Sequence, residues 1–230
     1  ESNKNSLLVQ KCEVIPVEFI VRGYICGSLW KHYSKGNREY CGVTFEDNLK
    51  QYQQLPEFII TPTNKDDLDL PTSYDEILKR KLLTKEQLDF IYEKCYQLYT
   101  LGSYECKQRN LILVDTKYEF GKADGTIYLI DEIHTPDSSR FFYAEGYQER
   151  QDKDEQQKQL SKEFVREWLI ENGFQGLEGQ TIPHIPDSFV NTVTERYTEL
   201  YEKITGETFV KADNSDLVNR IKKNVTEYLS

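Results

Sequence analysis

Three ionisable residues recur at every second position near the middle of this 230-residue sequence: Asp115, Lys117 and Glu119. They lie in the segment 111–120, whose β-branched and apolar residues predict a strand. Because side chains alternate along a strand, these three should share one face. The opposite face should then carry the residues between them: Val114, Thr116, Tyr118 and Phe120. Carboxylates and a lysine on one face suit Mg²⁺ bound to nucleotide phosphates, since Mg²⁺ prefers hard oxygen ligands and phosphate a positive charge.

A second apolar run, 126–133, turns acidic at Asp131. It follows the glycine-bearing segment 121–125, so the two runs predict a β-hairpin. If the strands pair, Glu119 and Asp131 come close together only near a cation, which favours Mg²⁺. The residues leave an alternative open, because salt-bridged charges are also common on the exposed face of an antiparallel sheet.

A glycine-bearing segment, 22–28, follows the apolar strand predicted at 14–21 and contains Arg22 and Ser28. Glycine lets the backbone approach a ligand, Ser28 can cap a following helix, and helix N-terminal amides attract phosphate. Glycines after a strand also form simple turns. A phosphate-binding loop and a plain turn are both compatible with this segment.

The segment 133–140 predicts a loop that contains hydroxyl groups and Arg140. An arginine can hold an anion through two parallel hydrogen bonds. The plainer alternative is a turn at Asp137, with Arg140 paired locally. His134 is interpreted as a loop or packing residue rather than a base.

The remaining elements must hold these segments in place. Three prolines interrupt residues 34–73, which are interpreted as a long insertion with little regular structure. Thr84 opens a helix through a capping box with Gln87, and this helix is expected to stop at Gly102. Apolar periodicity predicts a helical extension over 160–230. Its helices are expected at 160–172, 187–206 and 215–229.

Composition limits the classes of partner. The net charge of −10 argues against a general affinity for nucleic acid, which requires many basic contacts to phosphates. No apolar run approaches the ~20 residues of a membrane span, and no signal peptide is visible. The five cysteines are odd in number and lack a C-x-x-C pair, which indicates the reduced thiols of a cytoplasmic protein. The oligomeric state does not follow from the sequence.

Three segments together resemble signatures of the SAICAR synthetase family. VRGYICGS at 21–28 resembles the family's V-R-x-x-x-x-G-S signature. LVDTKYEFG at 113–121 resembles L-x-D-x-K-x-E-F-G, and DEIHTPDSSR at 131–140 resembles D-E-x-x-x-P-D-x-S-R. The order and spacing of the segments also match, and the resemblance covers residues 10–230.

The resemblance implies an α+β fold with two layers related to the ATP-grasp arrangement, an antiparallel sheet and C-terminal helices. The chain 1–230 would form the central and C-terminal parts of one such domain. The resemblance also implies a reaction of purine biosynthesis that uses ATP and Mg²⁺. ATP activates the carboxylate of carboxyaminoimidazole ribonucleotide, and the amine of L-aspartate then displaces phosphate. Such phosphoryl transfer needs positive charge around the γ-phosphate more than a protein nucleophile.

The resemblance assigns the hairpin to ATP and the metal. By match to the motifs, Glu119 and Asp131 would hold Mg²⁺. Lys117 would act in catalysis by contacting the substrate carboxylate or the phosphates. Strand geometry, rather than the resemblance, suggests that Asp115 orients Lys117.

The resemblance assigns the two loops to the ribonucleotide. Arg22 and Ser28 would bind its phosphate, and Arg140 would assist them. Asp137 would line the same pocket near the imidazole and take part in catalysis.

The sequence departs from the family pattern at its start. Family members begin with a β-rich segment that covers the nucleotide phosphates with a glycine-rich turn and lysines, and nothing precedes Glu1 here. An N-terminal β subdomain is therefore expected to be missing from this chain. If it is physically absent, ATP binding should be weak and turnover low. Two other functions stay open, namely a related ATP-dependent small-molecule kinase and a non-catalytic phosphoribonucleotide-binding protein.

Overall fold

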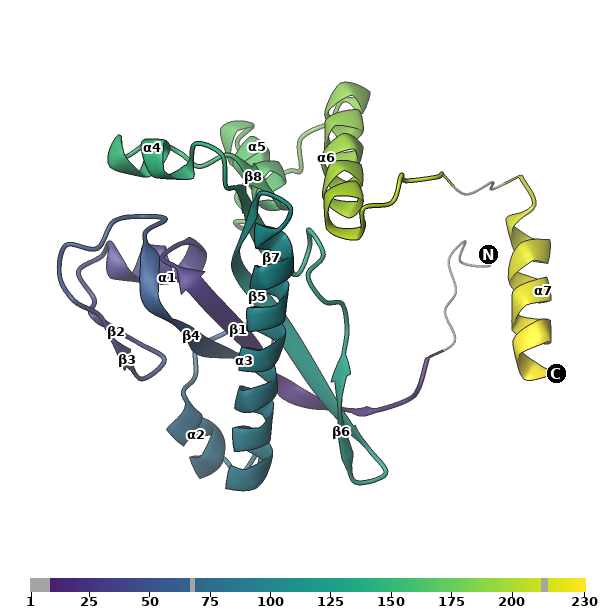
Figure 1. The fold of residues 1–230 in the computed structure, drawn as a ribbon, viewed down its shortest axis with the longest axis horizontal. Coiled ribbons are helices and arrows are strands. Elements are labelled where there is room, and N and C mark those ends of the chain that lie inside the picture. The colour runs from purple at the N-terminus through teal and green to yellow at the C-terminus, as the bar shows by residue number, and fades with distance from the viewer. Residues whose placement is uncertain (1–8, 67–68, 212–214) are drawn as a thin grey trace.

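An antiparallel sheet forms the centre of the computed structural model, which describes residues 9–66, 69–211 and 215–230 (Figure 1). Its strands are β1 (Glu13–Tyr24), β4 (Gln54–Asn64), β5 (Leu111–Ala123), β6 (Thr126–Ile130), β7 (Ser139–Tyr143) and β8 (Gln159–Leu160). The order across the sheet is β4-β1-β5-β7-β8, and β6 also pairs with β5. Two strands pair with the same edge of β5: β7 pairs with residues 111–116 and β6 with residues 119–123.

The long helix α3 (Lys85–Lys107) packs on one face of this sheet and forms the second layer (Figure 1). It begins at the predicted capping box, in which Thr84 and Gln87 exchange hydrogen bonds. Its apolar stripe is buried against the Phe19 and Tyr118 face of the sheet. The residues of this stripe are Leu88, Ile91, Cys95, Tyr99 and Cys106. The α+β class predicted from the sequence is confirmed by these two layers.

The predicted stop of this helix at Gly102 is wrong. The helix continues to Lys107, and Gly102 lies buried within it. A Cβ atom at this position would overlap Cε1 of His134. Gly102 therefore serves a close approach between the helix and the loop that contains His134, and it does not terminate the helix.

The expectation of little regular structure in residues 34–73 is also wrong. The segment contains β4, an 11-residue strand that pairs with β1 at the edge of the main sheet. An edge strand tolerates Pro56 and Pro62 because no full strand needs a donor on its outer side; near Pro62 that side only meets residues 70–72, where the Thr72 N–H donates to the Pro62 carbonyl oxygen. Short elements surround it: α1 (Gly27–Tyr33), β2 (Glu39–Tyr40), β3 (Val43–Thr44) and α2 (Tyr74–Lys79). Whether the segment is an insertion relative to other members stays a prediction.

The predicted hairpin is confirmed, with a tighter turn than expected. The strands meet at Ala123 and Thr126, so only Asp124 and Gly125 form the turn, both with positive φ. An Asp-Gly pair favours such two-residue turns. The second strand ends at Ile130 rather than at residue 133, and Asp131 follows with φ 65°.

The predicted face of β5 that contains Val114 with Tyr118 is wrong at Val114, because the strand has a bulge between Leu113 and Asp115. Leu113 and Tyr118 belong to the core under α3, whereas Val114 packs with Cys26 and Phe142 in a separate cluster. Strict alternation across a bulge fails, because the extra residue shifts the phase of the strand.

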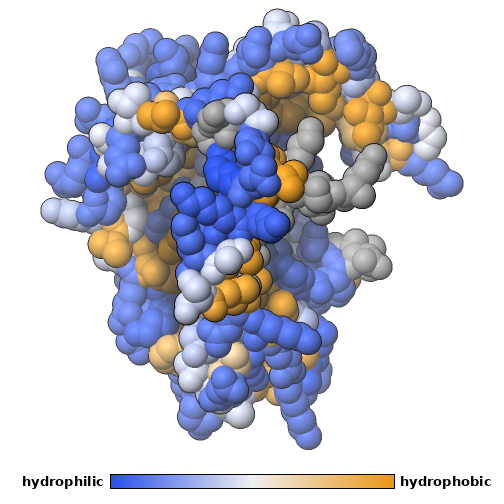
Figure 2. Space-filling view, turned by 90° about the vertical axis from the view of Figure 1, so that its right-hand side faces the viewer, coloured by the Kyte–Doolittle hydropathy of each residue, from blue (hydrophilic) through white to orange (hydrophobic). Residues whose placement is uncertain are grey.

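Four helices make up most of the C-terminal region: α4 (Tyr147–Asp152), α5 (Glu163–Glu171), α6 (Asp187–Thr205) and α7 (Leu217–Leu229). The three helices predicted beyond residue 160 are confirmed, and Gly206 closes α6 with φ 74°. In Figure 1, α5 and α6 lie near one end of the sheet, and α7 stands apart from it. Figure 2 shows the side of the molecule that lies on the right in Figure 1. Its surface is mostly hydrophilic, with hydrophobic residues gathered in the upper part of the view. Within the described residues, no helix has the length and apolar character to cross a bilayer.

Candidate functional site

The candidate site lies on the face of the sheet opposite α3. Along β1, Phe19 and Val21 point into the core under α3, so Glu18 and Arg22 point the other way. Glu18 is directly opposite Glu119 on β5, and Arg22 is directly opposite Asp115. Directly opposed residues of antiparallel strands project to the same face. The sheet therefore carries two polar clusters on one face, four residues apart along β5.

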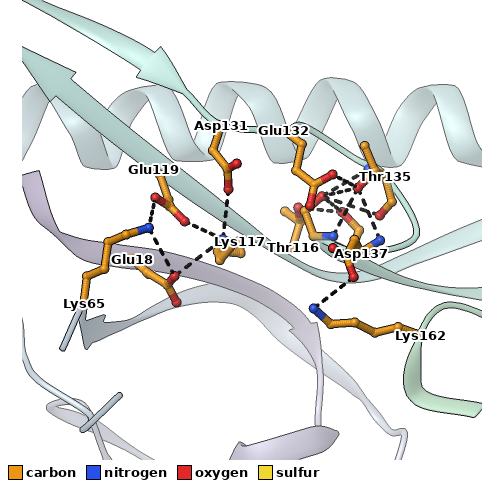
Figure 3. Close-up of polar contacts among 12 residues, drawn as sticks. Glu18, Lys65, Thr116, Lys117, Glu119, Asp131, Glu132, Thr135, Asp137 and Lys162 are labelled. Atoms are coloured by element: carbon orange, nitrogen blue, oxygen red, sulfur yellow. Dashed lines mark hydrogen bonds and ion pairs between the residues drawn. The ribbon is translucent and has the colours of Figure 1, made fainter. Parts of the chain in front are cut away.

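The first cluster surrounds the ammonium group of Lys117 (Figure 3). Lys117 Nζ donates to Glu119 Oε1 and to Asp131 Oδ2, the latter at 3.0 Å, and lies 3.5 Å from Glu18 Oε1. Lys65, just after β4, pairs with the other carboxylate oxygen of Glu119. Glu119 is only 3% exposed, so its charge is held by two ammonium groups inside the protein. The structure thus brings together the predicted residues Lys117, Glu119 and Asp131.

Proton affinities in this cluster follow its contacts. Burial opposes the charged form of Lys117, but its hydrogen bonds to Glu119 and Asp131 outweigh burial and raise the lysine pKa. Burial likewise opposes ionisation of Asp131, but the hydrogen bond and charge of Lys117 lower the aspartate pKa. At Glu18 the cost of burial wins and raises the pKa.

The second cluster is built on Asp115, which is 6% exposed. Its Oδ2 accepts a hydrogen bond from Arg140 Nη1 at 2.6 Å and another from Arg22 Nη1 at 3.2 Å. Arg22 Nη2 also donates to Ser28 Oγ at 2.8 Å. The predicted residues Arg22, Ser28 and Arg140 therefore meet, as an anion site requires.

Two interpretations of this cluster need correction. Ser28 does not cap α1, whose N-cap residue is Cys26. Asp115 was expected to orient Lys117, but the hydrogen bonds described for it join Arg22, Arg140 and Cys26. Register explains the difference, because Lys117 lies opposite Ile20 and Asp115 lies opposite Arg22.

Cys26 and a large cavity border the arginines. The Cys26 thiol donates to Asp115 at 3.3 Å, and burial raises its pKa to about 12, so it stays protonated near neutral pH. Arg140 also donates to Glu163 on α5 at 3.1 Å. A cavity of about 1310 Å³ opens here, lined in part by Gly27, Arg140 and Glu163. Arg140 is therefore accessible from a space large enough for a nucleotide-sized ligand, whereas Arg22 lies buried behind it.

Asp137 stays outside the arginine cluster. Its carboxylate is exposed and pairs with Lys162 at 3.2 Å, and its backbone N–H donates to Thr135 (Figure 3). The Thr135 hydroxyl closes a short turn, because it accepts from the N–H groups of Asp137 and Ser138. The resemblance implies that Asp137 lines the same pocket near the imidazole, and this role stays a prediction. In the structure its carboxylate lies beside Lys162, at the start of α5.

His134 is a packing residue, as the sequence indicated. Its Nε2 lies 2.6 Å from the hydroxyl of Tyr118, and its ring fills the space over Gly102. Burial lowers its pKa to about 4. The loop between β6 and β7 is thereby attached to α3 next to Asp131.

Glu18 and Lys65 were not selected from the sequence. Glu18 lies two strand periods before Arg22, so alternation along β1 was the available signal. Lys65 carried no such signal, because its place depends on the pairing of β4 with β1.

The carboxylates of Glu119 and Asp131 are the type of ligand that a magnesium-bound nucleotide requires. Glu119 on β5 and Asp131, just after β6, converge on one positive charge, that of Lys117. Within the described residues, no group of three or more acidic, histidine or cysteine side chains is arranged as a metal centre. Two carboxylates supplemented by phosphate oxygens remain compatible with Mg²⁺, which commonly uses one or two carboxylates together with substrate phosphates.

Comparisons with known proteins converge on one family. The sequence profile of SAICAR synthetase matches residues 1–180. A phosphoribosylaminoimidazole-succinocarboxamide synthase of Bacteroides fragilis is 56% identical over 222 residues, 95% of this chain and 71% of the relative. A SAICAR synthase from Saccharomyces cerevisiae complexed with SAICAR has a TM-score of 0.72 at 35% identity, covering 87% of this chain and 64% of that one. A SAICAR synthetase in complex with ADP has a TM-score of 0.63 at 27% identity, covering 88% of this chain and 68% of that one.

Proposed function

Because the chain belongs to the SAICAR synthetase family, we propose that it catalyses the reaction for which its relatives are named. In this reaction ATP drives the ligation of L-aspartate to carboxyaminoimidazole ribonucleotide, giving SAICAR, ADP and phosphate. The chain spans 71% of the length of the Bacteroides relative and 64% of the yeast structure, so the whole enzyme's activity is a proposal for this chain.

The observation that carries the proposal is the pair of clusters on one sheet face. Lys117, Glu119 and Asp131 are joined by ion pairs and would form a site for a cation and phosphates, and Arg22 and Arg140 converge on Asp115 and would form a site for an anion. Asp115 and Glu119 are four residues apart, about 13 Å along a strand. That separation leaves room for the reacting carboxylate of a ribonucleotide to meet the γ-phosphate of ATP near Lys117.

The chemistry matches these residues. Amide formation from a carboxylate requires a better leaving group, which phosphorylation of the carboxylate supplies. The protein then mainly positions its substrates and stabilises charge. Lys117 provides the positive charge of the first cluster, and its raised pKa keeps it protonated at neutral pH. The amine of L-aspartate attacks the activated carbon, and phosphate leaves.

Magnesium belongs to the proposal as the partner of ATP. Glu119 and Asp131 would hold it, and when bound it would neutralise charge that develops on the phosphates. The related SAICAR synthetase that was solved in complex with ADP supports the use of ATP by this chain.

The anion site is proposed for the ribonucleotide phosphate. Arg22 and Arg140 would bind its oxygens, with Ser28 donating a hydrogen bond once its hydroxyl turns to the ligand. Asp137 is proposed to approach the imidazole after its pair with Lys162 opens, because both residues are exposed. The substrates are small cytoplasmic metabolites, and nucleic acid and membranes are not proposed as partners.

The test incubates the chain with ATP, Mg²⁺ and carboxyaminoimidazole ribonucleotide, with and without L-aspartate. We expect SAICAR, identified by mass, and phosphate release that depends on L-aspartate. Release of phosphate without L-aspartate would contradict the proposal and indicate a kinase or ATPase. Binding of the ribonucleotide by calorimetry without any product would instead indicate a non-catalytic binding protein.

A further inference from the structure

A buried hydroxyl without a partner lies beside the acidic cluster. Thr63 on β4 is 6% exposed, and its Oγ1 makes no hydrogen bond to the described residues. Thr63 is directly opposite Glu18 in the sheet, and Glu18 is directly opposite Glu119. Opposed residues of antiparallel strands have Cβ atoms about 5 Å apart on the same face. Because an unpaired buried hydroxyl costs free energy, this row of three oxygen-bearing side chains suggests a ligand that supplies the missing contact.

Two ammonium groups now compensate the acids of this row. Lys117 Nζ lies 3.5 Å from Glu18 Oε1, and Lys65 Nζ lies 3.9 Å from the same oxygen while pairing with Glu119. The Lys65 side chain is 41% exposed, compared with 27% for Lys117. Lys65 also follows the end of an edge strand. It is therefore the ammonium group that can move into solvent while the buried carboxylates stay in place.

We propose that Glu18 and Thr63 complete a divalent-cation site with Glu119, and that Lys65 is the resident counter-ion which the cation displaces. Carboxylate and hydroxyl oxygens are hard ligands of the kind that Mg²⁺ prefers. The three carboxylates Glu18, Glu119 and Asp131 outnumber the two lysines, so the cluster favours a cation over an anion. The inference rests on the proposed function, which requires a divalent cation beside the nucleotide.

If the divalent cation displaces the ammonium group of Lys65, substitution of Lys65 should have a specific effect on cation affinity. If its ammonium group competes with the divalent cation, removing its charge strengthens cation binding, whereas removing a ligand weakens it. Lys65→Met keeps most of the aliphatic stem and deletes the charge. Glu18→Gln replaces a charged carboxylate by a neutral amide, which is a weaker cation ligand, and Thr63→Val removes the hydroxyl, both with little change in volume.

The experiment titrates the chain with Mn²⁺ in the absence of nucleotide, follows free Mn²⁺ by electron paramagnetic resonance, and then displaces Mn²⁺ with Mg²⁺. We expect Lys65→Met to bind Mn²⁺ about tenfold more tightly and Glu18→Gln about tenfold more weakly. Thr63→Val should weaken binding by about threefold, and Thr63→Ser, which keeps the hydroxyl, should bind like the original chain.

Matched controls separate this site from general charge effects. Lys79→Met removes an exposed lysine of α2 that pairs with Glu76, and Glu105→Gln removes an acid of α3 that pairs with Arg109. Neither should change Mn²⁺ affinity. Urea unfolding curves of every variant establish that the affinities refer to folded protein.

Unchanged Mn²⁺ affinity in both Glu18→Gln and Lys65→Met would overturn the inference. Weaker binding in Lys65→Met would overturn the role of Lys65 as a competitor. If the chain forms SAICAR although Glu18→Gln binds Mn²⁺ normally, the inference fails and the proposed function stands. If Mn²⁺ affinity follows Glu18 and Lys65 but no product depends on L-aspartate, the cation site stands and the proposed function fails.

Discussion

One carboxylate oxygen, Oδ2 of Asp115, accepts hydrogen bonds from two guanidinium groups. Arg22 and Asp115 are both almost completely buried. Without the aspartate charge, two like charges would face each other in a region with little water. Breaking a buried ion pair by removing one partner typically costs about 3–5 kcal/mol. Asp115 is therefore a positioning residue that keeps Arg22 and Arg140 close enough to bind one anion.

Asp115→Asn is expected to lower the free energy of unfolding by about 3 kcal/mol, because the buried Arg22 loses the carboxylate charge that it pairs with, while Arg140 keeps its pair with Glu163. Urea denaturation at neutral pH measures this change. The control is Asp47→Asn, whose exposed carboxylate pairs with Arg38 at 2.7 Å. That variant should lose no more than about 1 kcal/mol, as expected for a surface pair. Equal losses in the two variants would show that Asp115 does not compensate buried charge.

Asp131→Asn tests the metal assignment with little risk to folding, because the Asp131 side chain is 42% exposed. We expect Mg²⁺-dependent turnover to fall by about 100-fold. The variant would lose a ligand of the metal ion, and the metal ion would stabilise the charge that develops in the transition state. Steady-state assays over a range of Mg²⁺ concentrations measure the effect. Asp124→Asn, at the turn of the same hairpin, should retain full activity. Full activity of Asp131→Asn would rule out a role in metal binding.

At the scale of elements, the sequence patterns correctly predicted those helices and turns that are determined by interactions between residues close together in the chain. The capping box at Thr84, the hairpin around Gly125 and the C-terminal helices all depend on residues close together in sequence. They were predicted correctly because turns, caps and helical periodicity require no distant partner. The same holds for the grouping of Glu119 with Asp131, which follows from pairing within one hairpin.

The features that could not be predicted from the sequence depend on pairing between segments far apart in the chain. The strand β4 was missed because its prolines argue against a strand unless it is known to lie at a sheet edge. The bulge before Asp115 depends on the partner strand β7. The resemblance implied that Asp137 lines the ligand pocket near the imidazole, but its pair with Lys162, the residue before α5, depends on packing that no motif encodes. The functional roles of the predicted site residues stay predictions.

The helix α3 keeps a glycine in its interior because His134 packs there. A Cβ atom at residue 102 would overlap the His134 ring, so Gly102→Ala should destabilise the protein by about 1–3 kcal/mol despite alanine's higher helix propensity. Unfolding free energies measure this effect. The double variant Gly102→Ala, His134→Ala should recover part of the loss, because the smaller side chain relieves the overlap. Additive losses in the double variant would contradict a direct contact.

At the scale of the whole molecule, His134 connects the two layers. It extends from the loop between β6 and β7, which belongs to the sheet layer, onto the surface of α3. Its hydrogen bond with Tyr118 lies beneath the strand that carries Lys117 and Glu119. Global stability should therefore respond to the protonation of this one side chain.

The sign of that response follows from the His134 pKa of about 4, compared with about 6.5 in the unfolded chain. Between these values the unfolded state binds the proton more readily, so stability should fall as pH decreases from about 6.5 to about 4, by on the order of 3 kcal/mol. Urea unfolding at pH 7, 6 and 5 measures the trend. His134→Asn should flatten it, since asparagine tolerates the positive φ and carries no titrating group. His184→Asn, an exposed control, should leave the trend intact, and an unchanged slope in His134→Asn would locate the pH dependence in other groups.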